Sequence, residues 1–77
     1  MSYYYLRVGD DDLNTAERHR SKADALAAYA EVARELARYD QRIEATVHIA
    51  EQRSLVCDYP DFVLSLGPRG GVCCEDA

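Results

Sequence analysis

The stretch from Arg42 to Glu51, RIEATVHIAE, restricts the architecture of this chain more than any other segment. Apolar positions alternate with the others, so that Ile43, Ala45, Val47 and Ile49 share one side and Glu44, Thr46, His48 and Ala50 the other. A period of two is typical of a β-strand with one face in a core and one in water. A sheet covered by helices on both faces would instead show a nearly continuous apolar run. The segment therefore predicts an antiparallel or mixed sheet with one helical layer, whose second face is free.

A single helix is predicted from Ser21 to Gln41. Ser21 and Asp24 stand three residues apart, as an N-cap and an acidic residue of the first turn do. Apolar residues recur at intervals of three and four, which is the helical period. This apolar stripe consists of Leu26, Tyr29, Ala30, Ala33, Leu36 and Ala37. Its alanines should let the helix lie close to the sheet.

Three further segments have the character of strands. Tyr3 to Val8 alternates, with Tyr4, Leu6 and Val8 on one side. Asp61 to Leu66 follows Pro60 and turns Phe62, Leu64 and Leu66 toward the core. The glycine-rich loop from Gly67 to Gly71 leads into a short last strand, Val72 to Glu75, in which Val72 and Cys74 share a face. Asn14 to Arg20 is a further candidate strand, after a turn at Gly9 to Asp12.

These elements predict an α+β fold in which one helix packs on a four- to five-stranded, mainly antiparallel sheet. The chain has 77 residues, and a chain of this size buries only about 60 to 65% of its unfolded surface. We therefore expect residues 1–77 to form a single small domain. A deep substrate pocket would take up too much of so small a core.

The charge is acidic and uneven. Fourteen acidic residues against nine basic ones give a formal charge of −5, which repels nucleic acid and favours basic partners. One acidic block is Asp10, Asp11 and Asp12, and the second comprises Asp58, Asp61, Glu75 and Asp76. The N-terminus has no signal-peptide pattern, and no stretch approaches the ~20 apolar residues of a membrane span. We expect a soluble, cytoplasmic protein that binds neither membranes nor nucleic acid directly.

The cysteines and histidines do not form a recognisable reactive or metal-binding pattern. Cys57, Cys73 and Cys74 are odd in number and contain no C-x-x-C pair, which favours a reducing compartment and a packing role. Neighbouring residues of a strand point to opposite faces, so Cys73 and Cys74 are poorly placed to share a zinc ion with His19 or His48. No cation or pocket is evident that would activate a cysteine nucleophile. We expect no catalytic residue, metal or cofactor; a zinc-assisted enzyme is the alternative that these side chains leave open.

Tyrosines supply candidate binding residues. The chain has six tyrosines and no tryptophan, and tyrosine is enriched in the centres of protein interfaces. Tyr3 and Tyr5 share one side of the first strand, and Tyr59 precedes the last hairpin. We therefore predict that these three rings and the seven acids of the two blocks contact a protein partner. The alternative for each ring is that it packs within the fold.

The stretches NTAERH, RIEATVHIAE and YPDFVLSLGPRGG resemble those of small proteins carried by phages and mobile elements. Among such proteins of known role, the chain is similar to anti-CRISPR proteins. The similarity is one of size, acidity and architecture over the whole chain, and it carries over no functional residue. It implies a non-enzymatic inhibitor in the bacterial host cytoplasm. Such an inhibitor docks on a CRISPR effector complex, often on the basic surface that binds DNA, and blocks target binding or nuclease recruitment.

Two consequences can be stated in advance. Carboxylates that take the place of DNA phosphates on a basic surface should bind less tightly as salt rises. The alternative function is a self-associating, dimeric interaction or antitoxin-like module with no CRISPR role. In that case a free sheet face or edge would pair with a second copy of the chain.

Overall fold

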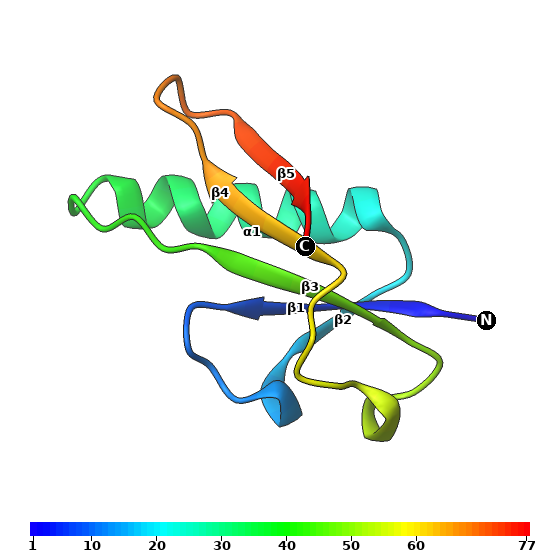
Figure 1. The fold of residues 1–77 in the computed structure, drawn as a ribbon. Coiled ribbons are helices and arrows are strands. Elements are labelled where there is room, and N and C mark those ends of the chain that lie inside the picture. Colours follow the sequence, from blue (N-terminus) through cyan, green and yellow to red (C-terminus); the bar gives the residue numbers. More distant parts are fainter.

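The computed structural model describes all residues 1–77 and shows one helix packed on a five-stranded antiparallel sheet (Figure 1). This is the α+β architecture that the sequence predicts. The helix α1 spans Lys22–Ala37. The strands are β1 (Tyr3–Val8), β2 (Glu17–His19), β3 (Ala45–Ala50), β4 (Phe62–Leu66) and β5 (Val72–Asp76), and two short 3-10 helices are η1 (Leu13–Thr15) and η2 (Arg53–Leu55). Neither α1 nor the short helices have the length and apolar character that crossing a bilayer demands.

The strands lie in the order β2-β1-β3-β4-β5, and all neighbours are antiparallel. β1 and β3 pair along their full length, from Tyr3 opposite Ala50 to Val8 opposite Ala45. The two edges are therefore the short β2 and the longer β5. The hairpin of β4 and β5 extends beyond the rest of the sheet at its loop end (Figure 1).

Helix α1 begins as predicted. The Ser21 hydroxyl accepts a hydrogen bond from the Asp24 backbone N–H at 3.1 Å, which satisfies one of the free donors of the first turn. Tyr29 and Ala33 of the predicted stripe are buried, and Ala25 joins them. The Tyr29 hydroxyl donates a hydrogen bond to the Ile43 carbonyl at 2.7 Å, which ties the helix to the segment that leads into β3.

The main core lies between α1 and the sheet. The buried helix residues include the small Ala25 and Ala33, which let the helix approach the strands closely. Val72 and Cys74 of β5 pack against this core together, as the sequence predicts for that strand. The buried members are Leu6, Ala25, Tyr29, Ala33, Ala45, Val47 and Leu64.

The second face of the sheet is not free, and this part of the prediction is wrong. The two 3-10 helices and their flanking loops lie over β1 and β3 on that side, and Tyr5, Ala16 and Ala50 form a second buried cluster there. His48, expected in water, is only 1% exposed. The loops supply Ala16 and Val56 as apolar cover, which alternation within a strand cannot reveal. On β5 this face is not covered, since Cys73 and Glu75 are exposed.

Two further expectations need correction. Ile49 was placed on the core side of β3 but is 38% exposed. The candidate strand Asn14 to Arg20 shortens to Glu17–His19, because Asp12 caps η1 just before it. An Asp12 side-chain oxygen accepts a hydrogen bond from the Asn14 N–H at 2.9 Å, and the Asp12 carbonyl accepts one from the Thr15 hydroxyl at 2.8 Å.

Candidate functional site

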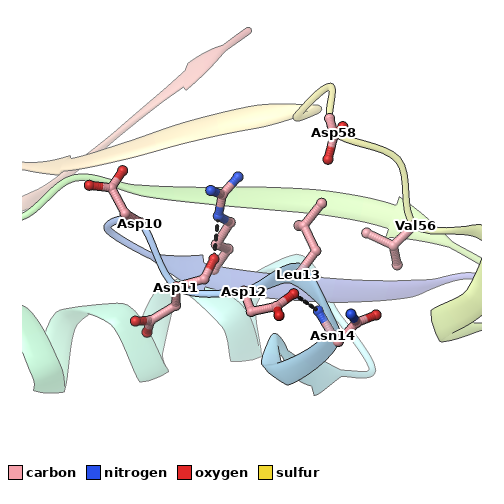
Figure 2. Close-up of a pocket in the computed structure, with 8 residues that line it drawn as sticks. Asp10, Asp11, Asp12, Leu13, Asn14, Val56 and Asp58 are labelled. Atoms are coloured by element: carbon pink, nitrogen blue, oxygen red, sulfur yellow. Dashed lines mark hydrogen bonds between the residues drawn. The ribbon is translucent and has the colours of Figure 1, made fainter.

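The acidic residues of the two loops that cover the second face gather around one open hollow (Figure 2). Asp10, Asp11 and Asp12 come from the loop after β1, and Asp58 comes from the loop between η2 and β4. The hollow has a volume of about 380 Å³. Its remaining lining residues are Arg7, Leu13, Asn14 and Val56. The fold therefore joins one member of the second acidic block to the whole of the first.

The turn after β1 is shaped by Gly9, whose φ of +61° lies in the left-handed region that favours glycine. Arg7 then reaches across this turn, and its Nε donates a hydrogen bond to the Asp11 carbonyl at 2.7 Å. Neither ion pair of the molecule involves an aspartate of the hollow. The lining thus contains four carboxylates and a single guanidinium, which is engaged by the backbone, so the hollow carries a net negative charge.

The other predicted acidic residues lie elsewhere. The Asp61 carboxylate accepts a hydrogen bond from the Ile49 N–H at 2.7 Å, and the Asp61 N–H donates to the Val47 carbonyl at 2.8 Å. Asp61 thereby prolongs the pairing of β3 with β4 and has a structural role. Glu75 and Asp76 are exposed on the edge strand β5 and do not line the hollow.

The three candidate tyrosines differ in exposure. Tyr59, next to Asp58, is 83% exposed and offers its ring to a partner. Tyr3 is half-buried, with the Arg18 guanidinium 4.8 Å from its ring centre. Tyr5 is 1% exposed, so the expectation that it contacts a partner is corrected: its ring packs in the second cluster beneath the loops.

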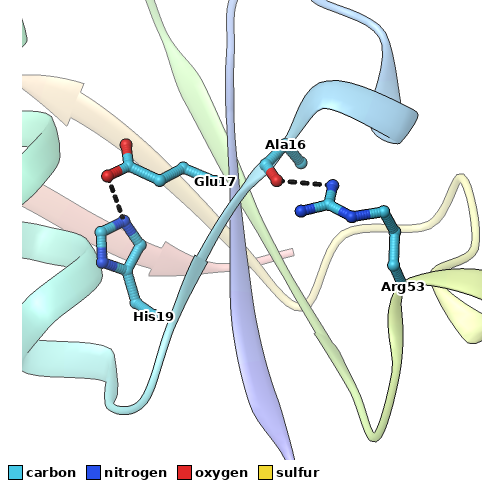
Figure 3. Close-up of polar contacts among 4 residues, drawn as sticks. All are labelled: Ala16, Glu17, His19 and Arg53. Carbon is cyan, nitrogen blue, oxygen red and sulfur yellow. Dashed lines mark hydrogen bonds and ion pairs between the residues drawn. The ribbon is translucent and has the colours of Figure 1, made fainter.

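Arg53 is a structurally important residue that the sequence analysis did not identify (Figure 3). Its Nη1 donates hydrogen bonds to the carbonyls of Asn14 and Ala16 at 3.0 and 2.7 Å, so it joins η2 to the segment around η1. Figure 3 also shows His19 of β2, whose Nε2 lies 3.6 Å from the Glu17 carboxylate. The contacts of Arg53 connect residues far apart in the chain, and no spacing rule would have indicated them.

Beneath Arg53 lies a buried polar pair. Tyr5 and His48 face each other across β1 and β3, and both side chains are 1% exposed. His48 Nε2 lies 2.9 Å from the Thr46 hydroxyl, while the Tyr5 hydroxyl and His48 Nδ1 have no protein partner. The loops cover this pair.

The cysteines are not paired with a histidine. The one hydrogen bond of a cysteine sulfur runs from Cys57 to the Tyr59 carbonyl at 3.6 Å. Cys57 and Cys73 are exposed, so the predicted packing role holds for the half-buried Cys74 alone. The structure has no group of three or more His, Cys, Asp or Glu side chains arranged to hold a metal ion.

Comparison of the chain with protein-family models, curated proteins and solved structures finds no match.

Proposed function

We propose that this protein is a non-enzymatic inhibitor of the anti-CRISPR type. It docks on the basic DNA-binding surface of a CRISPR effector complex and blocks target DNA binding or nuclease recruitment. The docking surface is the acidic hollow, edged by Asp10, Asp11, Asp12 and Asp58. The observation that supports this function is the gathering of four aspartates from two distant loops around one hollow, without an ion-pair partner for any of them.

The chemistry of the hollow fits a lysine- or arginine-rich partner. Carboxylates on an exposed surface keep their negative charge at neutral pH, and a complementary basic surface accelerates association and fixes orientation. The exposed ring of Tyr59, beside Asp58, supplies apolar contact area next to the charges. Interfaces combine such aromatic anchors with a polar surround.

The loops that carry the aspartates are held before any partner arrives. Asp12 caps η1, and Arg53 bonds two carbonyls of the neighbouring segment. A surface that is already ordered loses less conformational entropy on binding. Both loops also rest on the sheet through Ala16 and Val56, so the hollow is supported from below.

The test is a pull-down of the tagged protein from bacterial lysate that contains CRISPR effector complexes, washed at low and then at high salt. The test variant replaces the four aspartates of the hollow by asparagine, which keeps the oxygen that caps η1. A control variant removes the same number of charges from the helix side of the molecule: Asp24→Asn, Glu31→Gln, Glu35→Gln and Asp40→Asn.

We expect the wild type and the control to retain an effector complex at low salt and to release it at high salt. The hollow variant should not retain it. Equal retention of the two variants would exclude the hollow as the docking surface. Recovery of nothing but further copies of the protein itself would favour the self-associating module with no CRISPR role.

A further inference from the structure

Strand β5 is an edge strand with a defined set of free backbone groups. Its hairpin with β4 is bracketed by two hydrogen bonds, from the Gly67 N–H to the Gly71 carbonyl at 2.7 Å and from the Ala77 N–H to the Asp61 carbonyl at 3.2 Å. Between them the register places Ser65 opposite Cys73 and Val63 opposite Glu75.

Hydrogen-bonded and non-hydrogen-bonded pairs alternate along an antiparallel ladder. The two bracketing bonds mark hydrogen-bonded pairs, and the pairs of Cys73 with Ser65 and of Glu75 with Val63 are of the same kind. The backbone N–H and C=O groups of Cys73 and Glu75 therefore bond to β4. The N–H and C=O groups of Val72, Cys74 and Asp76 point the other way, where the sheet has no further strand. Such a row of free donors and acceptors is a template for another strand.

We propose that the edge of β5 binds the β5 edge of a second copy of this chain, antiparallel and with the two-fold axis at Cys73. The two five-stranded sheets then form one continuous sheet. This inference does not rest on the proposed function, because it uses β5 and leaves the acidic hollow exposed on both copies.

The charges and the outward backbone groups of the hairpin select this register. The outward groups of the edge belong to Val72, Cys74 and Asp76, and the position of the two-fold axis decides which of them meet. With the axis at Cys73, Val72 pairs with Cys74 of the second copy, and the exposed Arg69 of the loop lies opposite Ala77, diagonal to the second copy's Glu75. Opposite charges brought together across a strand pair are stabilising.

Neighbouring registers lose part of this match. An axis at Cys74 places Asp76 opposite Val72 and moves Arg69 past the acids of the second copy. An axis at Glu75 places the two Glu75 residues opposite each other, and like charges directly opposite are destabilising. An axis at Val72 also brings Arg69 to the second copy's Glu75, but it pairs only Val72 with an outward residue of that copy. Acidic residues on an edge normally discourage pairing, and the Cys73 register combines the contact of Arg69 with Glu75 and two pairs of outward groups.

Cys73 provides a direct test of the axis. Its backbone groups bond to β4, so the two copies of Cys73 would form a non-hydrogen-bonded pair, with Cα atoms about 4.5 Å apart. A disulfide tolerates Cα separations of about 4.4 to 6.8 Å. Cys73 is exposed, and its side chain lies on the opposite face from that of Cys74. An added oxidant of the copper–phenanthroline class, which accepts two electrons while two thiols release two protons, would join the two sulfurs.

The experiment uses three variants that each keep one cysteine and carry serine at the other two positions. We expect the variant that keeps Cys73 to form a covalent dimer at micromolar concentration within minutes. The variants that keep Cys57 or Cys74 should form little covalent dimer under the same conditions. If the Cys57 variant forms a covalent dimer as fast as the Cys73 variant, the disulfides arise from random collisions of monomers, and the proposal is overturned.

The reduced wild-type protein is measured by sedimentation equilibrium in parallel. We expect a concentration-dependent dimer that Arg69→Glu weakens at least tenfold and that Arg69→Glu with Glu75→Arg restores. A wild type that stays monomeric up to the highest soluble concentration would overturn the proposal. The asparagine variant of the hollow should dimerise like the wild type, so this test and the pull-down fail independently.

Discussion

The guanidinium carbon of Arg53 lies 5.3 Å from the centre of the buried Tyr5 ring. The same side chain donates hydrogen bonds to the carbonyls of Asn14 and Ala16. One residue of η2 therefore covers a ring of β1 and holds the segment around η1 in place. Since Asn14 lines the acidic hollow, and Val56 and Asp58 follow Arg53 in the chain, this contact also organises the proposed docking surface.

We predict that Arg53→Ala lowers the free energy of unfolding by about 1 to 3 kcal/mol, because two carbonyls lose a charged donor and the Tyr5 ring loses its cover. Urea denaturation measures the change, and hydrogen exchange should accelerate around η1. Arg34→Ala, on the exposed side of α1, is the control and should change stability by no more than about 0.5 kcal/mol. Equal effects of the two substitutions would show that Arg53 has no special role.

The second prediction concerns Asp61, which stabilises the fold, whereas the control aspartate, Asp58, lines the hollow. Asp61→Ala leaves the Ile49 N–H without its acceptor and should lower the free energy of unfolding by about 1 to 3 kcal/mol. Asp61→Asn keeps an oxygen acceptor and should cost less. Asp58→Ala removes an equal charge from the hollow and serves as the control, with little expected effect on thermal unfolding. If Asp58→Ala lowered the stability as much as Asp61→Ala, the structural role assigned to Asp61 would be contradicted.

Local and periodic signals predicted the helix side of the molecule well. Ser21 caps α1 through a contact three residues away, which the sequence displays directly. Val47 and Leu64 are buried where alternation placed them, because α1 covers that face along both strands. The fold class follows from these same signals, since one helix and alternating strands leave few ways to build a core.

The other side of the sheet depends on contacts that no local pattern encodes. Alternation correctly places Tyr5 and His48 away from the main core, yet it cannot tell whether loops cover them. Asp58 reaches the hollow through the path of an irregular loop, and Arg53 bonds to residues more than thirty positions away in the chain. Tertiary contacts therefore bring four of the ten predicted residues to one hollow, and they place Tyr5 and Asp61 elsewhere.

The Tyr29 hydroxyl predicts how stability depends on alkaline pH. Burial raises the pKa of Tyr29 above its ordinary value of 10.0, and the negative charges of Glu44 and of the Cys73 thiolate raise it further. The folded state thus holds this proton more tightly than the unfolded state does. The resulting stability is fully present below pH 10 and is lost as the pH rises from there through the folded-state pKa.

Tyr29→Phe should therefore have two effects. At neutral pH it loses the hydrogen bond to the Ile43 carbonyl and about 0.5 to 1.5 kcal/mol of stability. Above pH 10 the free energy of unfolding of the variant should fall less steeply with pH than that of the wild type. The two slopes should differ by up to about 1.4 kcal/mol per pH unit, which is the contribution of one proton. Urea midpoints between pH 8 and pH 11 measure both effects. Tyr39→Phe, at an exposed tyrosine, should follow the wild-type curve, and a Tyr29→Phe curve parallel to it would refute the argument.

The three thiols should react at different rates with an aromatic disulfide reagent. Cys57 and Cys73 are exposed and should react quickly, whereas Cys74 lies opposite the buried Leu64, packs against the main core and should react slowly. In urea all three should react alike, because the packing that protects Cys74 is lost. The measurement is made on dilute protein, since pairing through β5 would also shield Cys73 at higher concentration. A single fast phase for all three thiols of the folded protein would mean that β5 does not hold Cys74 against the core, and it would remove the rigid edge on which strand pairing depends.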